Sequence, residues 1–255
     1  MGTLTREQIA QFVRDGYVVA PQCFDSQTAT DLIPLFWEAA PISPSDRSGW
    51  EKKVYLVQKN FVDGPAKALW SEVGIGVLDD LVGAERYLPP QGSGWVLLNL
   101  PGFAHTPWTA PTDGWHIDGI HFHHHVHSRE QGLIGLLLFT DVEPGGGGTA
   151  VNPGSHHITA RILRDAEPEG LDHVELARRV GAATEGMPVV EVRGNAGDIL
   201  MMHPHLYHAS SANCSERVRI ASNFCVTLRE PMNLKRPDPA DYSPVEQAIV
   251  LAISE

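Results

Sequence analysis

Apolar positions in the first ninety residues recur mostly with a helical period, and capping residues mark where helices begin. Thr5 and Gln8 form a capping box. The apolar stripe that follows ends at Gly16, a residue type suited to the turn that closes a helix. We therefore predict a helix over residues 5–15, a strand over residues 17–20, a second helix over residues 26–40, a polar loop over residues 41–49 and mixed helical segments over residues 64–82.

From residue 94 the pattern changes to short apolar runs separated by glycine and proline. The glycine run over residues 145–148 indicates a tight turn, because it lacks the Lys-Ser/Thr pair and the following helix of a phosphate-binding loop. Ser243 and Glu246 form a second capping box around Pro244. We predict strands over residues 95–100, 132–140 (buried on both faces), 149–152, 189–192, 198–203 and 217–227, a helix or loop over residues 168–181, and a final helix over residues 243–253.

Helices first, short strands in the middle and one closing helix favour an antiparallel β-sandwich or jelly roll with helices packed on one face. The chain of 255 residues has no internal repeat and no long linker. We therefore expect one domain over residues 1–255, with a helical part over about 1–90, a jelly-roll core over about 91–230 and a C-terminal helix over about 243–253.

Composition narrows the partners and the compartment. The net charge is −12, and the 19 basic side chains form no cluster that would follow phosphates, so we expect neither nucleic acid nor an anionic membrane as a partner. No apolar run approaches the ~20 residues of a membrane span, and the N-terminal residues do not resemble a signal peptide. The 3 cysteines lack CxxC spacing, which indicates a reducing compartment. We expect a cytoplasmic protein.

Histidine stands out, with 13 in the chain and a concentration between positions 105 and 127. It is the commonest metal ligand in proteins. His116 and Asp118 form an H-x-D pair, and on a strand such a pair points to one face. A third ligand would complete the 2-His-1-carboxylate triad typical of non-heme Fe(II). The candidates for this third ligand are the downstream histidines His203, His205 and His208. An arginine on the next strand, Arg217 or Arg219, could bind a dicarboxylate through two hydrogen bonds.

Four segments carry a family resemblance when they are taken in order. They are EQIAQFVRDGYVV at residues 7–19, WHID at residues 115–118, GGGTAVNPGSH at residues 146–156, and GD at residues 197–198 leading to HASSAN at residues 208–213 and to Arg219. Together they span most of the chain, and their combination is specific. The chain resembles the phytanoyl-CoA dioxygenase family of Fe(II)/2-oxoglutarate-dependent oxygenases.

The resemblance implies a mainly β fold with flanking helices and a double-stranded β-helix core, which is a cupin-like jelly roll. It also implies that Fe(II) is bound by His116, Asp118 and His208. The family places an arginine for 2-oxoglutarate eleven positions after its distal histidine, and from His208 this position is Arg219.

The other two histidines do not fit that spacing. Eleven positions after His203 and His205 lie Cys214 and Glu216, neither of which can pair with a carboxylate. The resemblance further implies hydrogen bonds from two more side chains to 2-oxoglutarate, and these are Ser210 and Asn99.

A second group of histidines occupies residues 121–127. If this stretch is extended, its odd-numbered histidines share one face. In unbroken register that face is opposite to the metal pair, unless a bulge at Gly119 exchanges the two faces. The alternative is a set of loop histidines exposed to solvent. The candidate pocket residues are Trp115, His121, His123 and His125.

The resemblance implies that Fe(II), 2-oxoglutarate and O2 together oxidise a small molecule and release succinate and CO2. Asp118 is the carboxylate that related halogenating enzymes lack, so we expect hydroxylation, oxidative cyclisation or desaturation. The acidic composition argues against a polyphosphorylated CoA ester, and a natural product or glycosylated compound is preferred. Loops over residues 41–49, 105–113 and 231–242 are candidate lids. Two alternatives stay open: a cupin-like metal-dependent isomerase or hydrolase that needs no 2-oxoglutarate, and a binding domain without catalysis.

Overall fold

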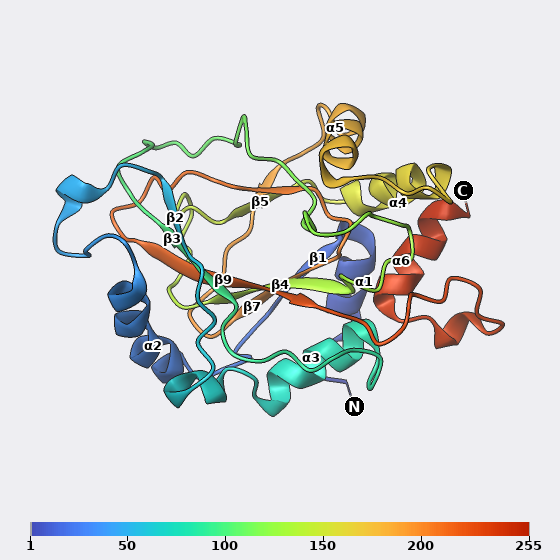
Figure 1. The fold of residues 1–255 in the computed structure, drawn as a ribbon, viewed down its shortest axis with the longest axis horizontal. Coiled ribbons are helices and arrows are strands. Elements are labelled where there is room, and N and C mark those ends of the chain that lie inside the picture. Colours follow the sequence, from blue (N-terminus) through green and yellow to red (C-terminus); the bar gives the residue numbers. More distant parts are fainter. Residues whose placement is uncertain (1, 255) are drawn as a thin grey trace.

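Two antiparallel sheets form the centre of the computed structural model, which describes residues 2–254 (Figure 1). The larger sheet contains β1 (Tyr17–Ala20), β2 (Val54–Val57), β3 (Trp95–Asn99), β4 (Leu133–Leu138), β7 (Ile199–Met202) and β9 (Arg219–Val226). The smaller sheet contains β5 (Thr149–Val151), β6 (Val190–Glu191) and β8 (His208–Ser210). The strand orders are β1-β7-β4-β9-β3-β2 and β6-β5-β8. The predicted antiparallel jelly roll with added helices is confirmed.

Helices cover one face of the larger sheet and gather at one end of it (Figure 1). They are α1 (Arg6–Asp15), α2 (Ser26–Ala39), α3 (Glu72–Val82), α4 (Ser155–Asp165), α5 (His173–Ala183) and α6 (Pro244–Ile253), with short 3-10 turns at Arg47–Gly49, Gly64–Ala68 and Pro239–Asp241. The C-terminal helix α6 packs against α1, α3 and α4. The two ends of the chain therefore meet in one helical layer.

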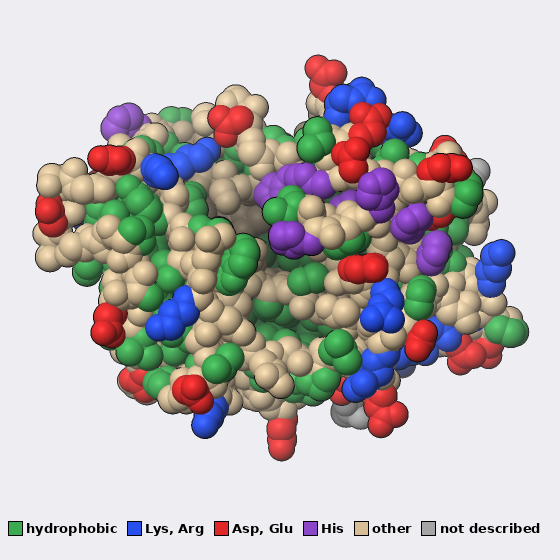
Figure 2. All heavy atoms as spheres, viewed as in Figure 1, with side chains coloured by type: hydrophobic (Ala, Val, Ile, Leu, Met, Phe, Trp, Pro, Cys, Tyr) green, Lys and Arg blue, Asp and Glu red, His purple; other side chains and the backbone are tan. Residues whose placement is uncertain are grey.

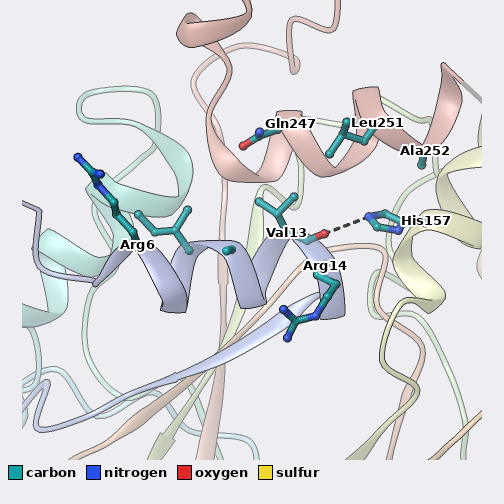
Figure 3. Close-up of a pocket in the computed structure, with 9 residues that line it drawn as sticks. Arg6, Val13, Arg14, His157, Gln247, Leu251 and Ala252 are labelled. Carbon is teal, nitrogen blue, oxygen red and sulfur yellow. Dashed lines mark hydrogen bonds between the residues drawn. The ribbon is translucent and has the colours of Figure 1, made fainter.

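The end of α1 shows how this layer is fixed. The capping box of Thr5 and Gln8 is present, and Gly16 closes the helix in the left-handed conformation, with φ +82°. A Cβ atom at Gly16 would lie 2.5 Å from the His156 ring, so this position requires glycine. His156 and its neighbour His157 on α4 both donate a ring N–H to the Val13 carbonyl oxygen, at 3.1 and 3.0 Å. Figure 3 shows the bond from His157. These bonds join α4 to the end of α1.

The central strand β4 is buried at all six positions, between β7 and β9, as its unbroken apolar sequence predicts. The apolar cluster beneath the larger sheet reaches from Leu4, near the N-terminus, to Ala252 in α6. Within this cluster, the Phe36 ring meets the Phe139 and Phe61 rings edge to face, with centroids 4.7 and 5.0 Å apart. This packing holds the sheet that positions the site described below.

Several elements differ from the sequence-based expectation. The strand β2 and the helix α4 were not predicted, and the three-residue strand β8 was not recognised as a strand. Residues 121–127 form turns with one β-bridge at His124 rather than an extended segment. The alternation expected for an extended stretch therefore does not apply, and the alternative of loop histidines describes this backbone. Within residues 2–254, no helix is both long and apolar enough to cross a membrane.

Candidate active site

Two histidines far apart in the sequence are paired through their main chains. The N–H of His116 donates to the carbonyl of His208 at 2.9 Å, and the N–H of His208 donates to the carbonyl of His116 at 3.1 Å. The segment around His116 thereby extends the smaller sheet beside β8. The two imidazole rings lie on the same side of this pair, with centroids 4.4 Å apart.

The ring nitrogens of both histidines have defined roles. The Nδ1 atom of His116 lies 2.8 Å from the Gly114 carbonyl, and that of His208 lies 2.9 Å from the Leu206 carbonyl. A carbonyl can only accept, so each Nδ1 must carry the proton and each Nε2 has a free lone pair in the neutral ring. This arrangement prepares both Nε2 atoms to bind a metal ion.

Asp118 completes the group. One of its carboxylate oxygens lies 3.1 Å from Nε2 of His116, and the other lies 3.8 Å from Nε2 of His208. Within the described residues this is the one set of three His, Cys, Asp or Glu ligand atoms that all lie within 4.8 Å of one another. Two imidazoles and one carboxylate are the donors of the facial triad of non-heme Fe(II) enzymes.

The electrostatics of the group favour a cation. Burial alone would raise the pKa of Asp118, but the hydrogen bond from His116 and the nearby histidines lower it to about 2. Burial lowers the pKa of His208 to about 4. For His116, burial lowers the pKa, but the bond and charge of Asp118 outweigh it and the net direction is upward. At neutral pH the site therefore offers an ionised carboxylate and a neutral His208, which are the protonation states that metal binding requires.

The other two candidates for the distal ligand lie elsewhere. His203 and His205 are buried beside His156, with ring centroids 5.1 Å apart from each other and 4.9 Å between His203 and His156. His203 is bonded to the Val245 carbonyl of α6 at 3.2 Å. The geometry therefore selects His208 as the histidine that faces His116 and Asp118.

Arg219 is the second polar feature of the site. It begins β9, is only 4% exposed, and its guanidinium makes a single 3.4 Å hydrogen bond to the Thr149 hydroxyl. Its Nε atom is buried and has no hydrogen-bond partner among residues 2–254. Burial lowers the pKa of Arg219 to about 10, although the charge of Glu191 opposes that shift. A buried guanidinium with unused N–H groups is suited to a carboxylate that enters from outside.

Two neighbours of Arg219 carry implied roles. Ser210 lies directly opposite Thr149 in the β5–β8 pair, so both hydroxyls are on the face that Arg219 contacts. Asn99 pairs with Arg219 in the β3–β9 register, but its amide nitrogen donates to the carbonyls of Gly147 and Ser211 at 3.0 and 2.9 Å. Asn99 in this conformation has no N–H left to donate to a carboxylate, so its contacts support a structural role.

A cavity of about 790 Å³ opens beside the metal-ligand group. Figure 2 shows the hollow with histidines along its rim. Its walls include His116, Asp118, residues of loop 119–131 and residues of β3 and β9. A second hollow, of about 540 Å³, lies between α1 and α6 (Figure 3) and contains none of the three candidate metal ligands.

Of the four candidate pocket residues, one lines the cavity and three do not. His121 lines the cavity. Trp115, His123 and His125 are not among its lining residues: Trp115 stacks on Tyr207 at 5.3 Å and bonds the Pro111 carbonyl, and His125 bonds Glu167 at 3.1 Å. His173, at the start of α5, lines the cavity and was not singled out from the sequence. No sequence motif marks it, because the fold brings α5 to the cavity from a distant position.

Comparison with known proteins agrees with the geometry. The carbocyclase SnoK from nogalamycin biosynthesis, described as non-heme and α-ketoglutarate-dependent, superposes with a TM-score of 0.57 at 22% identity, covering 89% of this chain and 86% of that one. HygX from Streptomyces hygroscopicus, solved with nickel, 2-oxoglutarate and hygromycin B bound, superposes with a TM-score of 0.52 at 15% identity. The match covers 88% of this chain and 87% of that one. EctD from S. alaskensis, solved with 2-oxoglutarate and 5-hydroxyectoine, superposes with a TM-score of 0.53 at 20% identity. The match covers 93% of this chain and 83% of that one. Among curated protein sequences, none matches.

Paired antiparallel sheets that carry a 2-His-1-carboxylate group define an Fe(II)/2-oxoglutarate-dependent oxygenase with a double-stranded β-helix. The sequence pattern of the family described as Phytanoyl-CoA dioxygenase (PhyH) matches residues 12–221, and the chain belongs to this family. Iron and 2-oxoglutarate are accordingly its cofactor and cosubstrate.

Proposed function

We propose that the protein oxidises a small organic molecule in the cavity beside His116, Asp118 and His208, which hold Fe(II). The observation that carries this proposal is the position of the ligand group: His116 and Asp118 form part of the wall of a cavity that is open to solvent. Bound iron, together with 2-oxoglutarate and O2, supplies the oxidising power, with succinate and CO2 as the coproducts.

The chain's own residues have separate tasks in this proposal. The carbonyls of Gly114 and Leu206 keep the two imidazoles in the tautomer that presents Nε2. Arg219 pairs with the far carboxylate of 2-oxoglutarate, and Thr149 and Ser210 add hydroxyl groups beside it. Because Arg219 is buried, this pairing takes place away from water and is correspondingly strong.

We propose hydroxylation, oxidative cyclisation or desaturation as the outcome, since Asp118 supplies the carboxylate that the halogenating relatives lack. A natural product or a glycosylated compound is the proposed substrate. SnoK acts in nogalamycin biosynthesis, and HygX was solved with hygromycin B bound, which supports this choice. Residues 1–255 are proposed to act as one domain, because one apolar cluster includes both Leu4 and Ala252. The free cysteines Cys23, Cys214 and Cys225 support a reducing, cytoplasmic location.

The test uses protein purified without oxygen. Fe(II) and 2-oxoglutarate are added, and the visible charge-transfer band between iron and the keto acid is recorded. We expect a band in the wild type and a much higher 2-oxoglutarate requirement in Arg219→Ala. A metal-dependent isomerase or hydrolase would bind the metal without this band and without any dependence on Arg219.

A further inference from the structure

The cavity beside the metal ligands is lined by acidic residues and histidines but by no lysine or arginine of the described residues. Two carboxylates, of Asp118 and Glu130, and three imidazoles contribute to its wall. Phosphate and carboxylate groups of ligands are bound in proteins mainly by arginine, lysine or helix N-termini. One helix N-terminus, that of α5 at His173, reaches the cavity, but the Asp172 carboxylate already caps it by accepting from the Glu175 N–H. A substrate with several negative charges would therefore find few partners in this cavity.

Glu130 differs from the other carboxylate because the metal group does not use it. Its main-chain carbonyl accepts hydrogen bonds from Cys225 and Thr227 on the β9 side, which fixes the backbone at this point. Its carboxylate forms no ion pair with any residue of the described chain. An unpaired carboxylate at the edge of a cavity suits a cation supplied by a ligand.

The remaining wall combines apolar and aromatic residues with four carboxamide residues, which are Asn60, Gln91, Gln131 and Asn223. Trp95 at the start of β3 is 41% exposed and Ile120 is 68% exposed, although both are large apolar residues. Phe224 is held in place by an edge-to-face contact with Trp70 at 4.6 Å. Exposed aromatic and aliphatic groups around a concave site are typical of ligand recognition.

We infer that the substrate is a ring-bearing amine, with its ring against Trp95 and Phe224 and its ammonium group paired with Glu130. This inference rests on the proposed function, since it assumes that the cavity is the substrate site. It predicts that acyl-CoA and other multiply anionic compounds bind more weakly in this cavity than a ring-bearing amine does.

The test compares two probes that share one ring system, 2-naphthylmethylamine and 2-naphthoate. Their dissociation constants are measured by ligand-observed NMR on the anaerobic complex with Fe(II) and 2-oxoglutarate. We expect the amine to bind at least tenfold more tightly than the acid. In Glu130→Gln this preference should fall below threefold. In Glu185→Gln, an exposed glutamate in the turn after α5, it should be unchanged.

Equal binding of the two probes, tighter binding of the acid, or an unchanged preference in Glu130→Gln would overturn the inference. The charge-transfer band is recorded on the same samples. A normal band without amine preference contradicts only the substrate class, whereas absence of the band contradicts the proposed function itself.

A second, independent observation concerns Glu191 on β6. Its carboxylate accepts three backbone hydrogen bonds from the glycine turn, from Gly145 at 2.7 Å, Gly147 at 3.2 Å and Gly148 at 3.1 Å. The converging N–H groups of such a turn form an anion-binding concavity. Here the chain's own carboxylate occupies it.

The same turn leads directly to the partners of Arg219. Thr149 follows Gly148 and accepts the single hydrogen bond of the guanidinium. The carbonyl of Gly147 accepts from Asn99, which pairs with Arg219 in the β3–β9 register. Glu191 is therefore connected to the proposed carboxylate site through the turn.

We propose that Glu191 is a positioning residue for 2-oxoglutarate, acting through the turn at residues 145–148 on Thr149 and Arg219. Its negative charge also attracts Arg219 and so competes with the incoming carboxylate. Positioning through the turn strengthens the binding of 2-oxoglutarate, and competition for Arg219 weakens it. Removing the Glu191 charge therefore shows which effect is larger. A positioning role predicts weaker binding of 2-oxoglutarate after substitution, and simple competition predicts tighter binding.

The test measures the dissociation constant of 2-oxoglutarate by calorimetry on the Mn(II)-loaded protein. For Glu191→Gln we expect an increase of at least tenfold, and for Glu191→Asp a smaller increase, because the carboxylate is retained. Glu143→Gln, an exposed glutamate before the same turn, should stay within twofold of the wild type. At saturating 2-oxoglutarate the charge-transfer band of Glu191→Gln should reach at least half of the wild-type intensity.

Unchanged or tighter binding in Glu191→Gln would overturn the positioning role. Loss of the band even at saturating 2-oxoglutarate would also overturn it, because the metal site itself would then be damaged.

Discussion

His116 and His208 are hydrogen-bonded to each other through their main chains in both directions, at 2.9 and 3.1 Å, although 92 positions separate them in the sequence. The relative position of the two proposed iron ligands is thus set by backbone pairing and not by their side chains. A change of either side chain should therefore affect metal binding far more than folding.

The first prediction follows from this pairing. His116→Ala should lower the affinity for Fe(II) or Mn(II) by at least about 100-fold, because a ligand matters more than the outer-shell groups that cost 10–100-fold. The apoprotein should lose no more than about 1 kcal/mol of unfolding free energy, since its backbone bonds persist and the pair with Asp118 is partly exposed. Calorimetric metal titration and urea unfolding measure the two effects. The exposed His105→Ala serves as the control, and a global loss of structure in His116→Ala would contradict this view.

The buried charge of Arg219 is predicted to destabilise the apoprotein. Its buried charge has one long hydrogen bond and an unpartnered Nε atom, so Arg219→Met should stabilise the apoprotein, by about 1–3 kcal/mol. The same variant should lose the thermal stabilisation that 2-oxoglutarate gives to the Mn(II)-loaded wild type. Thermal unfolding with and without 2-oxoglutarate tests both statements. A variant that is less stable yet still responds to 2-oxoglutarate would refute them.

The buried histidines predict sensitivity to acid. Burial lowers the pKa of His156 and of His205 to about 3, whereas both would be near 6.5 in the unfolded chain. Between these values the unfolded state binds more protons, so stability is fully present above pH 6.5 and is lost as the pH falls toward 3. The slope is up to about 1.4 kcal/mol per pH unit for each histidine. In His156→Gln, the change in unfolding free energy from pH 7 to pH 5 should be smaller than in the wild type. An equal change would show that His156 does not contribute.

Two glycines with positive φ allow a matched test of the backbone. Gly94 has φ +72° and a Cβ there would collide with the Asn223 carbonyl, whereas Gly102 has φ +94° and open space around it. Gly102→Ala should cost about 1–2 kcal/mol from the backbone conformation alone. Gly94→Ala should cost at least about 3 kcal/mol, because the collision is added. Urea denaturation gives both values, and similar costs would contradict the described register of β3 and β9.

Much of the fold follows from local sequence signals. The helix ends at Thr5, Gly16 and Ser243 carry capping residues, and the continuous apolar run of β4 marks a strand buried on both faces. The missed elements lack such signals. The strand β2 is short and only partly buried, and the N-cap residue of α4 is Gly154, which has no side chain to cap the helix.

The candidate site was predictable only in part. The H-x-D pair can be read from local spacing, but the choice of His208 over its neighbours needed either the family spacing or the observed pairing with His116. The contributions of His173 and Glu191 depend on contacts between distant segments, which no local pattern encodes. The turns at residues 121–127 depend on the main-chain pairing of His124 with Leu171, which is also a distant contact.

The central claim is that His116, Asp118 and His208 bind one iron ion. Crystals grown anaerobically with Fe(II) and 2-oxoglutarate, measured at the iron absorption edge, test it directly. We predict one strong anomalous peak, at about 2.0–2.2 Å from Nε2 of both histidines and from a carboxylate oxygen of Asp118. A peak at another histidine group, such as His125 and His127 with Glu167, and none at this site would contradict the claim.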